Sequence, residues 1–245
     1  MCILILLRDL DARHGLVVAS NRDERRDRPA APPGLWVGAR HRLLSPRDRR
    51  AGGTWLAVDE HGRVAGITNL AGVPPVAGAP SRGHLPHLVL DEQDLAAGIT
   101  RVREEVRTHR FAGFQLVVAD ARETFVLCHR DGELVVRPWS RPVLVVTNEH
   151  APGELWPFGL DSALAPELTL ERRFDLLAAV LRDPGGDGRH AVLKLGDDYG
   201  TVSSSLLAVP RDDATQLTWR YAPGSPDVTA YRNYGNLGRR LLPDT

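Results

Sequence analysis

Cysteine is scarce in this chain, and its scarcity excludes a disulfide framework. Cys2 and Cys128 are the two cysteines among 245 residues, whereas a small disulfide-stabilised scaffold needs several pairs. No group of cysteine, histidine and carboxylate has the spacing of a zinc site. His84 and His87 lie close together, but the sequence offers no third ligand beside them. We therefore expect a protein of the reducing cytoplasm that holds no metal.

The chain also lacks a net charge and a long hydrophobic run. Its 31 basic residues balance its 31 acidic residues, so no broad electrostatic attraction to nucleic acid is expected. The apolar run at residues 2–7 meets Arg8 at once and is too short for a secretory or membrane segment. These absences predict a protein with neither a nucleic-acid partner nor a membrane span.

Short β-rich runs dominate the sequence. Residues 2–7 and 16–20 are expected to form an antiparallel pair. Further strands are predicted at residues 54–58, 63–68, 114–119, 124–128, 133–137, 142–147, 200–209 and 216–221. The last pair, like residues 54–58 and 63–68, is expected to form a hairpin.

Helical periodicity appears in two places, residues 93–109 and 170–182, where apolar residues recur every three or four positions. Residues 25–53 and 70–83 are rich in proline with arginine or glycine, and we interpret both as surface loops near a site. Antiparallel strands with helices grouped between them predict an α+β layered sandwich, with residues 1–245 as a single domain.

Cys2 is the first candidate for chemistry. It directly follows the initiator Met1 and opens the apolar run. Removal of Met1 would place a thiol and a free α-amine on the same residue. An α-amine, with a reference pKa near ~7.7 to 8.0, can accept the proton of the neighbouring thiol. The alternative is that Cys2 is only a small buried apolar residue.

The cluster at residues 21–24 is the second candidate. Arg22 could hold the sulfur as a thiolate, and Asp23 could accept a hydrogen bond from the α-amine. In a hairpin the end of the second strand returns to the start of the first, so both side chains are expected beside Cys2. As an isolated tetrapeptide the cluster would instead be an exposed turn.

Several segments together resemble the NRDE family, which includes transport and Golgi organization protein 2. These segments are Met1-Cys2-Ile3-Leu4, Ala19-Ser20-Asn21-Arg22-Asp23-Glu24, Ala51-Gly52-Gly53-Thr54-Trp55-Leu56, Ser81-Arg82-Gly83, Thr147-Asn148 and Tyr199-Gly200-Thr201-Val202-Ser203-Ser204. Their order and spacing extend over nearly the whole chain. The resemblance implies a four-layer αββα sandwich of the N-terminal-nucleophile (Ntn) hydrolase type.

A more distant likeness is to choloylglycine hydrolases and penicillin V acylases. Those cysteine amidases combine the N-terminal cysteine with an Arg-x-x-Asp element, whereas Arg22 and Asp23 are adjacent in this chain. The adjacency would let one of the two side chains point away from Cys2. The likeness implies further site residues, which are the oxyanion donors Asn148 and Asn69 and the helix-opening Arg173.

Two classes of function are compatible with these residues. The first is a cysteine Ntn amidohydrolase or acyltransferase that forms an acyl-enzyme on Cys2 from a small amide or thioester, without a cofactor. The second is a non-catalytic carrier or chaperone of haem or of an acyl-CoA or lipid-like ligand, with Cys2 or a loop histidine as an axial ligand of haem. Substrate identity and oligomeric state are left open.

Overall fold

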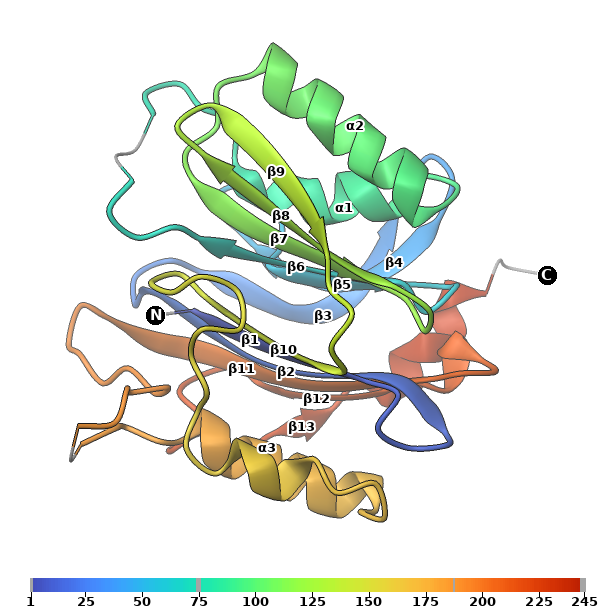
Figure 1. The fold of residues 1–245 in the computed structure, drawn as a ribbon, viewed down its shortest axis with the longest axis vertical. Helices are drawn as coiled ribbons and strands as arrows, with labels where there is room; N and C mark the ends of the chain where they lie inside the picture. The colour runs from blue at the N-terminus through green and yellow to red at the C-terminus, as the bar shows by residue number, and fades with distance from the viewer. Residues whose placement is uncertain (1, 74–75, 187, 243–245) are drawn as a thin grey trace.

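Two antiparallel sheets, stacked face to face, form the centre of the molecule (Figure 1). The structure is a computed structural model that describes residues 2–73, 76–186 and 188–242. Sheet I has the strand order β10-β1-β2-β11-β12-β13, and sheet II has the order β3-β4-β5-β6-β7-β8-β9. Sheet II therefore follows the chain as a simple meander, while sheet I brings together strands from both ends of the sequence.

The strands of sheet I are β1 (Ile3–Arg8), β2 (His14–Arg25), β10 (Val143–Thr147), β11 (Tyr199–Pro210), β12 (Thr218–Ala222) and β13 (Arg232–Asn233). The strands of sheet II are β3 (Ala30–Val37), β4 (Arg42–Asp48), β5 (Leu56–Asp59), β6 (Val64–Asn69), β7 (Phe114–Ala119), β8 (Thr124–Arg130) and β9 (Glu133–Pro138).

Helices cover the outer face of each sheet. The helices α1 (Leu85–Leu90) and α2 (Leu95–Thr108) lie on sheet II, and α3 (Leu170–Leu181) lies on sheet I (Figure 1). Short 3-10 helices among the described residues are η1 (Arg82–His84), η2 (Leu160–Ala163), η3 (Ala214–Gln216) and η4 (Gly235–Leu241). The order helix, sheet, sheet, helix confirms the αββα sandwich.

Burial on both faces explains why β1 is apolar at every position but its last. Along a strand successive side chains point to opposite faces. Leu4 and Leu6 accordingly pack in the core between the two sheets, while Ile3 and Ile5 pack toward α3. A third core, around Ala65 and its neighbours, lies between sheet II and its helices.

The prediction of a loop over residues 25–53 is wrong, because this segment contains β3 and β4 as well as the end of β2. Prolines made the segment unlike a strand, since proline cannot donate to a ladder. β3 tolerates Pro32 and Pro33 because it is an edge strand, and its register with β4 shifts between Ala31 and Gly34. Residues 70–73 and 76–81, in contrast, form neither helix nor strand.

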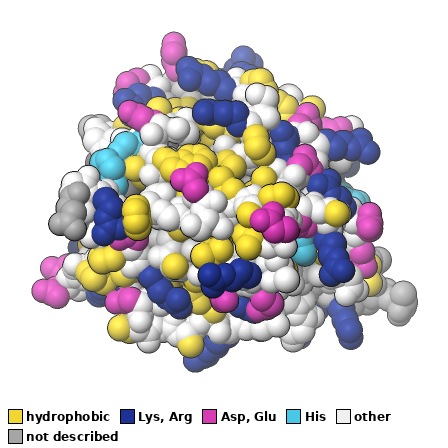
Figure 2. All heavy atoms as spheres, turned by 60° about the horizontal axis from the view of Figure 1, so that its bottom comes forward, with side chains coloured by type: hydrophobic (Ala, Val, Ile, Leu, Met, Phe, Trp, Pro, Cys, Tyr) yellow, Lys and Arg dark blue, Asp and Glu magenta, His cyan; other side chains and the backbone are white. Residues whose placement is uncertain are grey.

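No helix within the described ranges combines the length and the apolar character needed to cross a bilayer. Figure 2 turns the lower side of Figure 1 toward the viewer, and on that face basic and acidic side chains are interspersed. The surface shown there has no continuous field of one sign.

Candidate functional site

Cys2 lies at the beginning of β1, between two neighbouring strands of sheet I. Ile3 pairs with Asn21 of β2 and with Thr147 of β10. Continuing both pairings by one residue places Arg22 on one side of Cys2 and Asn148 on the other. Residues directly opposite each other in an antiparallel pair point to the same face. The side chains of Cys2 and Arg22 therefore share the face that is turned toward sheet II.

A cavity of about 500 Å³ opens beside Cys2. Its walls include Cys2, Arg22 and Asp23 from sheet I, and Trp55, Asn69 and Arg82 from sheet II and its connections. The structure confirms the prediction that the end of β2 lies beside Cys2. The cavity lies where the ends of β1, β2 and β6 meet.

The sulfur of Cys2 is held against the backbone of Asp23. Its Sγ atom lies 3.4 Å from both the amide nitrogen and the carbonyl oxygen of Asp23. Burial, followed by the negative charge of Asp23, raises the pKa of the Cys2 thiol to about 11, although the Arg22 guanidinium acts in the opposite direction. With Met1 still attached, this thiol is protonated at neutral pH.

Arg22 is buried beside Cys2 and is fixed by packing and by charge. Its Nη2 atom donates a hydrogen bond of 2.9 Å to Asp48, and its guanidinium stacks 4.4 Å from the ring centroid of Trp55. Its Nη1 atom is buried and has no hydrogen-bond partner among the described residues. Arg22 can therefore bind one more acceptor, such as a thiolate or an anionic group of a substrate, without losing its ion pair.

Asp48 connects the arginines of this site, although the sequence analysis did not single it out. Its carboxylate accepts hydrogen bonds from Arg22 and Arg28 and from the backbone amides of Arg50 and Ala51. Burial alone would raise the pKa of Asp48, but these donors hold it below its ordinary value. Asp48 lies in the segment that was predicted to be a loop, so its position in a strand could not be expected.

Asp23 is buried, and its carboxylate accepts a hydrogen bond of 2.7 Å from the Thr201 hydroxyl. Burial raises the pKa of Asp23. β11 has a bulge between Thr201 and Ser203, opposite Arg22 and Asp23. The bulge leaves Thr201 opposite Asp23 and Ser203 opposite Arg22, and both Arg22 and Asp23 are among the residues that line the cavity. The two side chains are directed differently, because Arg22 turns toward Asp48 of sheet II and the Asp23 carboxylate turns toward Thr201 of β11.

The two asparagines are placed differently. Asn69 is the last residue of β6 and lines the cavity. Asn148 flanks Cys2 by register without being among the lining residues, and its buried Oδ1 atom has no partner in the described part of the chain. The carbonyl oxygen of Asn148 accepts a hydrogen bond of 2.7 Å from the amide of Ala71. This bond fixes the backbone of Asn148 beside the loop that follows β6.

The structure does not bring Arg173 to the cavity. Arg173 is on α3, on the other face of sheet I, where its guanidinium donates hydrogen bonds to the carbonyls of Ala163 and Ala165. It also lies 4.0 Å from Asp11, which belongs to the connection at the far end of β1 from Cys2. These contacts give Arg173 a role in holding η2 against α3.

Arg82 and Tyr199 also belong to the site, and the sequence analysis missed both. Arg82 lines the cavity and donates a hydrogen bond of 2.8 Å to the carbonyl of Gly113. It makes no ion pair with any described residue, and burial lowers its pKa. Tyr199 donates to the carbonyl of Asp23, and burial raises the pKa of its hydroxyl. The segments Ser81-Arg82-Gly83 and Tyr199-Gly200-Thr201 contained the only signal for them.

The αββα layers, with a cysteine at the start of a central strand, define an Ntn-hydrolase-like fold. Two solved structures share it at low sequence identity. The Caenorhabditis elegans ortholog of N-acylethanolamine-hydrolyzing acid amidase has a TM-score of 0.50 and 15% identity, over 84% of this chain and 92% of that one. A variant of conjugated bile acid hydrolase from Clostridium perfringens has a TM-score of 0.51 and 9% identity, over 95% of this chain and 96% of that one. At these identities the likeness shows the fold alone.

Sequence comparison identifies the family. The profile described as Transport and Golgi organisation 2 matches residues 1–158. The Transport and Golgi organization protein 2 homolog of Bos taurus is 32% identical over 256 residues, which cover 86% of this chain and 87% of that protein. The human homolog is 33% identical over 109 residues, or 43% of this chain and 38% of that protein. This chain belongs to the transport and Golgi organisation 2 family, which confirms the resemblance noted from its motifs.

Proposed function

We propose that this chain, after removal of Met1, is an N-terminal-cysteine amidohydrolase or acyltransferase that acts on a small amide or thioester. The observation that carries the proposal is the position of Cys2 at the mouth of a polar cavity, flanked by Arg22 and Asn148. A merely structural cysteine at the start of a strand would need neither neighbour.

Catalysis begins with the transfer of the thiol proton to the α-amine of Cys2. The sulfur then attacks the carbonyl carbon, and the negative charge of the tetrahedral intermediate falls on the carbonyl oxygen. The side-chain nitrogen of Asn148 stabilises this oxyanion, with Asn69 as a second donor. The C–N or C–S bond breaks, and the α-ammonium returns the proton to the leaving group.

The thioester on Cys2 is resolved by a second attack. Water releases the acid and restores the thiol, which is hydrolysis. An amine or a thiol in place of water gives acyl transfer by the same steps. Asp23, which is held by Thr201, accepts a hydrogen bond from the α-amine and orients it, and Arg22 stabilises the thiolate.

The charges around the cavity favour a substrate with an anionic group. Arg22 and Arg28 share the carboxylates of Asp48 and Glu24, but Arg82 has no such partner among the described residues. A half-buried guanidinium without a counterion is stabilised by a bound anion. We therefore assign Arg82 to the binding of a carboxylate or phosphate that lies away from the scissile bond.

The test compares two alkylating agents of similar size on protein whose N-terminus is shown by intact mass to be Cys2. We expect iodoacetate, which is anionic, to modify Cys2 faster relative to Cys128 than neutral iodoacetamide does. Arg82→Gln should reduce this preference several-fold, and the iodoacetamide rate should change by less than the iodoacetate rate. Equal preference in both proteins would remove the role of Arg82 and leave the role of Cys2 intact.

Turnover tests the role of Cys2 itself. A panel of amides and thioesters, each with and without a carboxylate, is incubated with the processed protein, and the acyl-enzyme is sought by mass spectrometry. Cys2→Ala should abolish both turnover and the adduct, whereas Cys128→Ala should change neither. Turnover that persists in Cys2→Ala would eliminate the enzyme proposal.

A second cavity favours the alternative function, that of a carrier. It has a volume of about 710 Å³, and its walls include the apolar side chains of Leu70, Val126, Val135 and Trp139. An acyl chain or another apolar body fits such a lining. Under the carrier alternative, ligand binding survives in Cys2→Ala and no substrate is turned over.

A further inference from the structure

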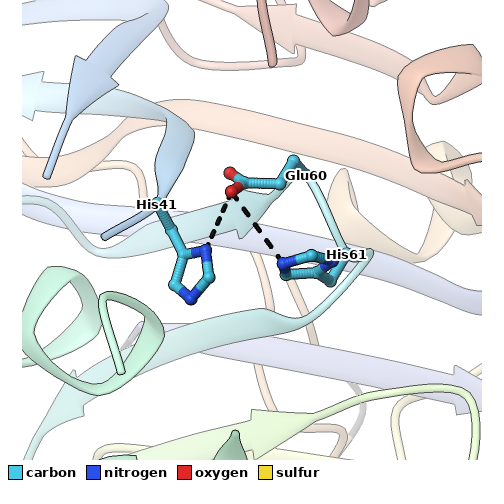
Figure 3. A group of neighbouring side chains, drawn as sticks. All are labelled: His41, Glu60 and His61. Carbon is cyan, nitrogen blue, oxygen red and sulfur yellow. Dashed lines mark hydrogen bonds and ion pairs between the residues drawn. The ribbon is translucent and has the colours of Figure 1, made fainter. Parts of the chain in front are cut away.

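Two histidines and a glutamate converge at the end of sheet II that is remote from Cys2. His41 lies just before β4, and Glu60 and His61 lie in the turn between β5 and β6 (Figure 3). β6 begins after this turn and ends at Asn69, which lines the cavity of Cys2. The histidine and glutamate group is therefore separated from that cavity by the length of β6. One ligand atom from each of the three side chains lies within 4.8 Å of the other two.

The distances between these atoms are close to those of a tetrahedral metal site. His41 Nδ1 is 2.8 Å from Glu60 Oε1, and His61 Nε2 is 3.9 Å from the same oxygen. Ligand bonds of about 2.0 to 2.2 Å to zinc put two tetrahedral ligand atoms roughly 3.3 Å apart. Each of the two contacts therefore needs to change by only about half an ångström.

The backbone of this group is held in place by two carboxylates, those of Asp91 and Asp59. Asp91 accepts hydrogen bonds from the amides of Ala39, Arg40 and His41. Asp59, which is fully buried, accepts hydrogen bonds from the amides of His61 and Arg63. The chain on both sides of the group is thus preorganised, as the supporting shell of a metal site must be.

The side chains can adjust without breaking other contacts. Glu60 uses its second oxygen to accept the amide of Arg42, which leaves Oε1 directed at the two rings. The Nε2 atom of His41 has no hydrogen-bond partner in the described part of the chain, so the ring proton can move there when Nδ1 binds a cation. His61 is 57% exposed and is free to turn toward the oxygen.

We propose that His41, Glu60 and His61 form a binding site for a divalent transition-metal ion of the zinc class. Imidazole and carboxylate ligands suit zinc, while a hard cation such as magnesium prefers oxygen ligands. Three protein ligands leave one tetrahedral position open for water or for an exogenous ligand. The ion would connect the start of β4 with the turn between β5 and β6, and so stabilise this end of sheet II.

Zinc binding to the chelator-treated full chain is measured by calorimetry, and cobalt is used as a spectroscopic probe of tetrahedral coordination. We expect one ion per chain at this group. His61→Ala changes an exposed side chain and should weaken zinc binding at least tenfold without loss of the fold, and Glu60→Gln should do the same. The rise in Tm that zinc causes in the parent chain should disappear in both variants.

The chain offers a matched control. Glu105 also lies between two histidines, with His84 Nε2 at 3.5 Å and His109 Nδ1 at 3.1 Å, yet its group does not bring three ligand atoms together within 4.8 Å. Glu105→Gln should leave zinc affinity within twofold of the parent. The proposal is overturned if His61→Ala binds zinc as tightly as the parent, if binding instead requires Cys2, or if no saturable binding is found.

Discussion

Removal of Met1 should switch on the reactivity of Cys2, and this can be tested on two forms of the same chain. One form keeps an uncleaved N-terminal extension, so that residue 2 has an ordinary peptide nitrogen. The other form begins at Cys2 and has the free α-amine. Every other residue is identical, and intact mass establishes which form is present.

The size of the effect follows from the environment of the sulfur. With its pKa at about 11, roughly 0.03% of the thiol is ionised at pH 7.5. The free α-amine of Cys2, added to the Arg22 guanidinium that already acts on the sulfur, can bring the pKa of the thiol to ~7.5, where about half is ionised. The thiolate fraction then rises about 1,500-fold. A thiolate of lower pKa is also a weaker nucleophile, with a Brønsted coefficient of ~0.4 to 0.5, which reduces the expected gain to roughly 30- to 60-fold.

The assay is the pseudo-first-order rate of iodoacetamide modification at pH 7.5, followed by peptide mapping. Cys128 serves as the internal reference, because burial raises the pKa of its thiol in a part of the chain that the extension does not alter. In the extended form, the Cys2 rate should keep rising with pH up to about 11. Rates for Cys2 that agree within threefold between the two forms would refute the reasoning.

Three further predictions concern the residues around Cys2. Asp48→Asn removes the charge that is hydrogen-bonded to Arg22, which then keeps only the more distant Glu24 as an acidic partner among the described residues, and should lower the free energy of unfolding in urea by about 2 to 4 kcal/mol. Because the pKa of Asp48 lies below its ordinary 3.8, this difference should be complete above that pH and shrink as the pH falls through the lower, folded-state value. A Cβ atom on Gly66 would lie 2.1 Å from Leu4 Cδ1, so Gly66→Ala should cost about 1 to 3 kcal/mol in the same assay, and an unchanged midpoint would contradict this. Asn148→Ala should lower amide turnover by about 10² to 10³ with no loss of thermal stability, and full activity would exclude it as the oxyanion donor.

Local pairing made part of the site predictable from the sequence. The apolar run after Cys2 and the polar cluster at the end of the next strand are the two ends of one hairpin, so their proximity follows from strand geometry alone. The position of Asn148 follows in the same way, because β10 pairs with β1 on its other side. No strand pairing connects Arg173, which is on α3, to Cys2. Its prediction as a site residue rested only on the resemblance to choloylglycine hydrolases and penicillin V acylases.

Sheet II and its connections contribute Asn69, which was predicted, and also Asp48 and Arg82, which were not singled out as site residues. Asp48 and Arg82 reach the cavity because the two sheets stack, and no strand pairing connects either residue to β1. The prolines of β3 made this segment unlike a strand, so the hairpin of β3 and β4 was not predicted. Asp48 is the last residue of β4. The metal-binding group was concealed for a similar reason, since 19 positions separate His41 from Glu60, and only the pairing of β4 with β5 brings them together.

Unpaired polar atoms explain why function is expected at the Cys2 end of the stacked sheets. Arg22 Nη1, Thr68 Oγ1, Gln115 Oε1 and Asn148 Oδ1 are buried without a hydrogen-bond partner among the described residues. Thr68 and Gln115 face each other across β6 and β7, next to the cavity-lining Asn69. Each such atom costs about 1 to 3 kcal/mol of folding free energy, and apolar residues at the same positions would avoid this cost. The presence of these unpaired atoms at this end of the sandwich supports the proposal that a polar ligand binds there.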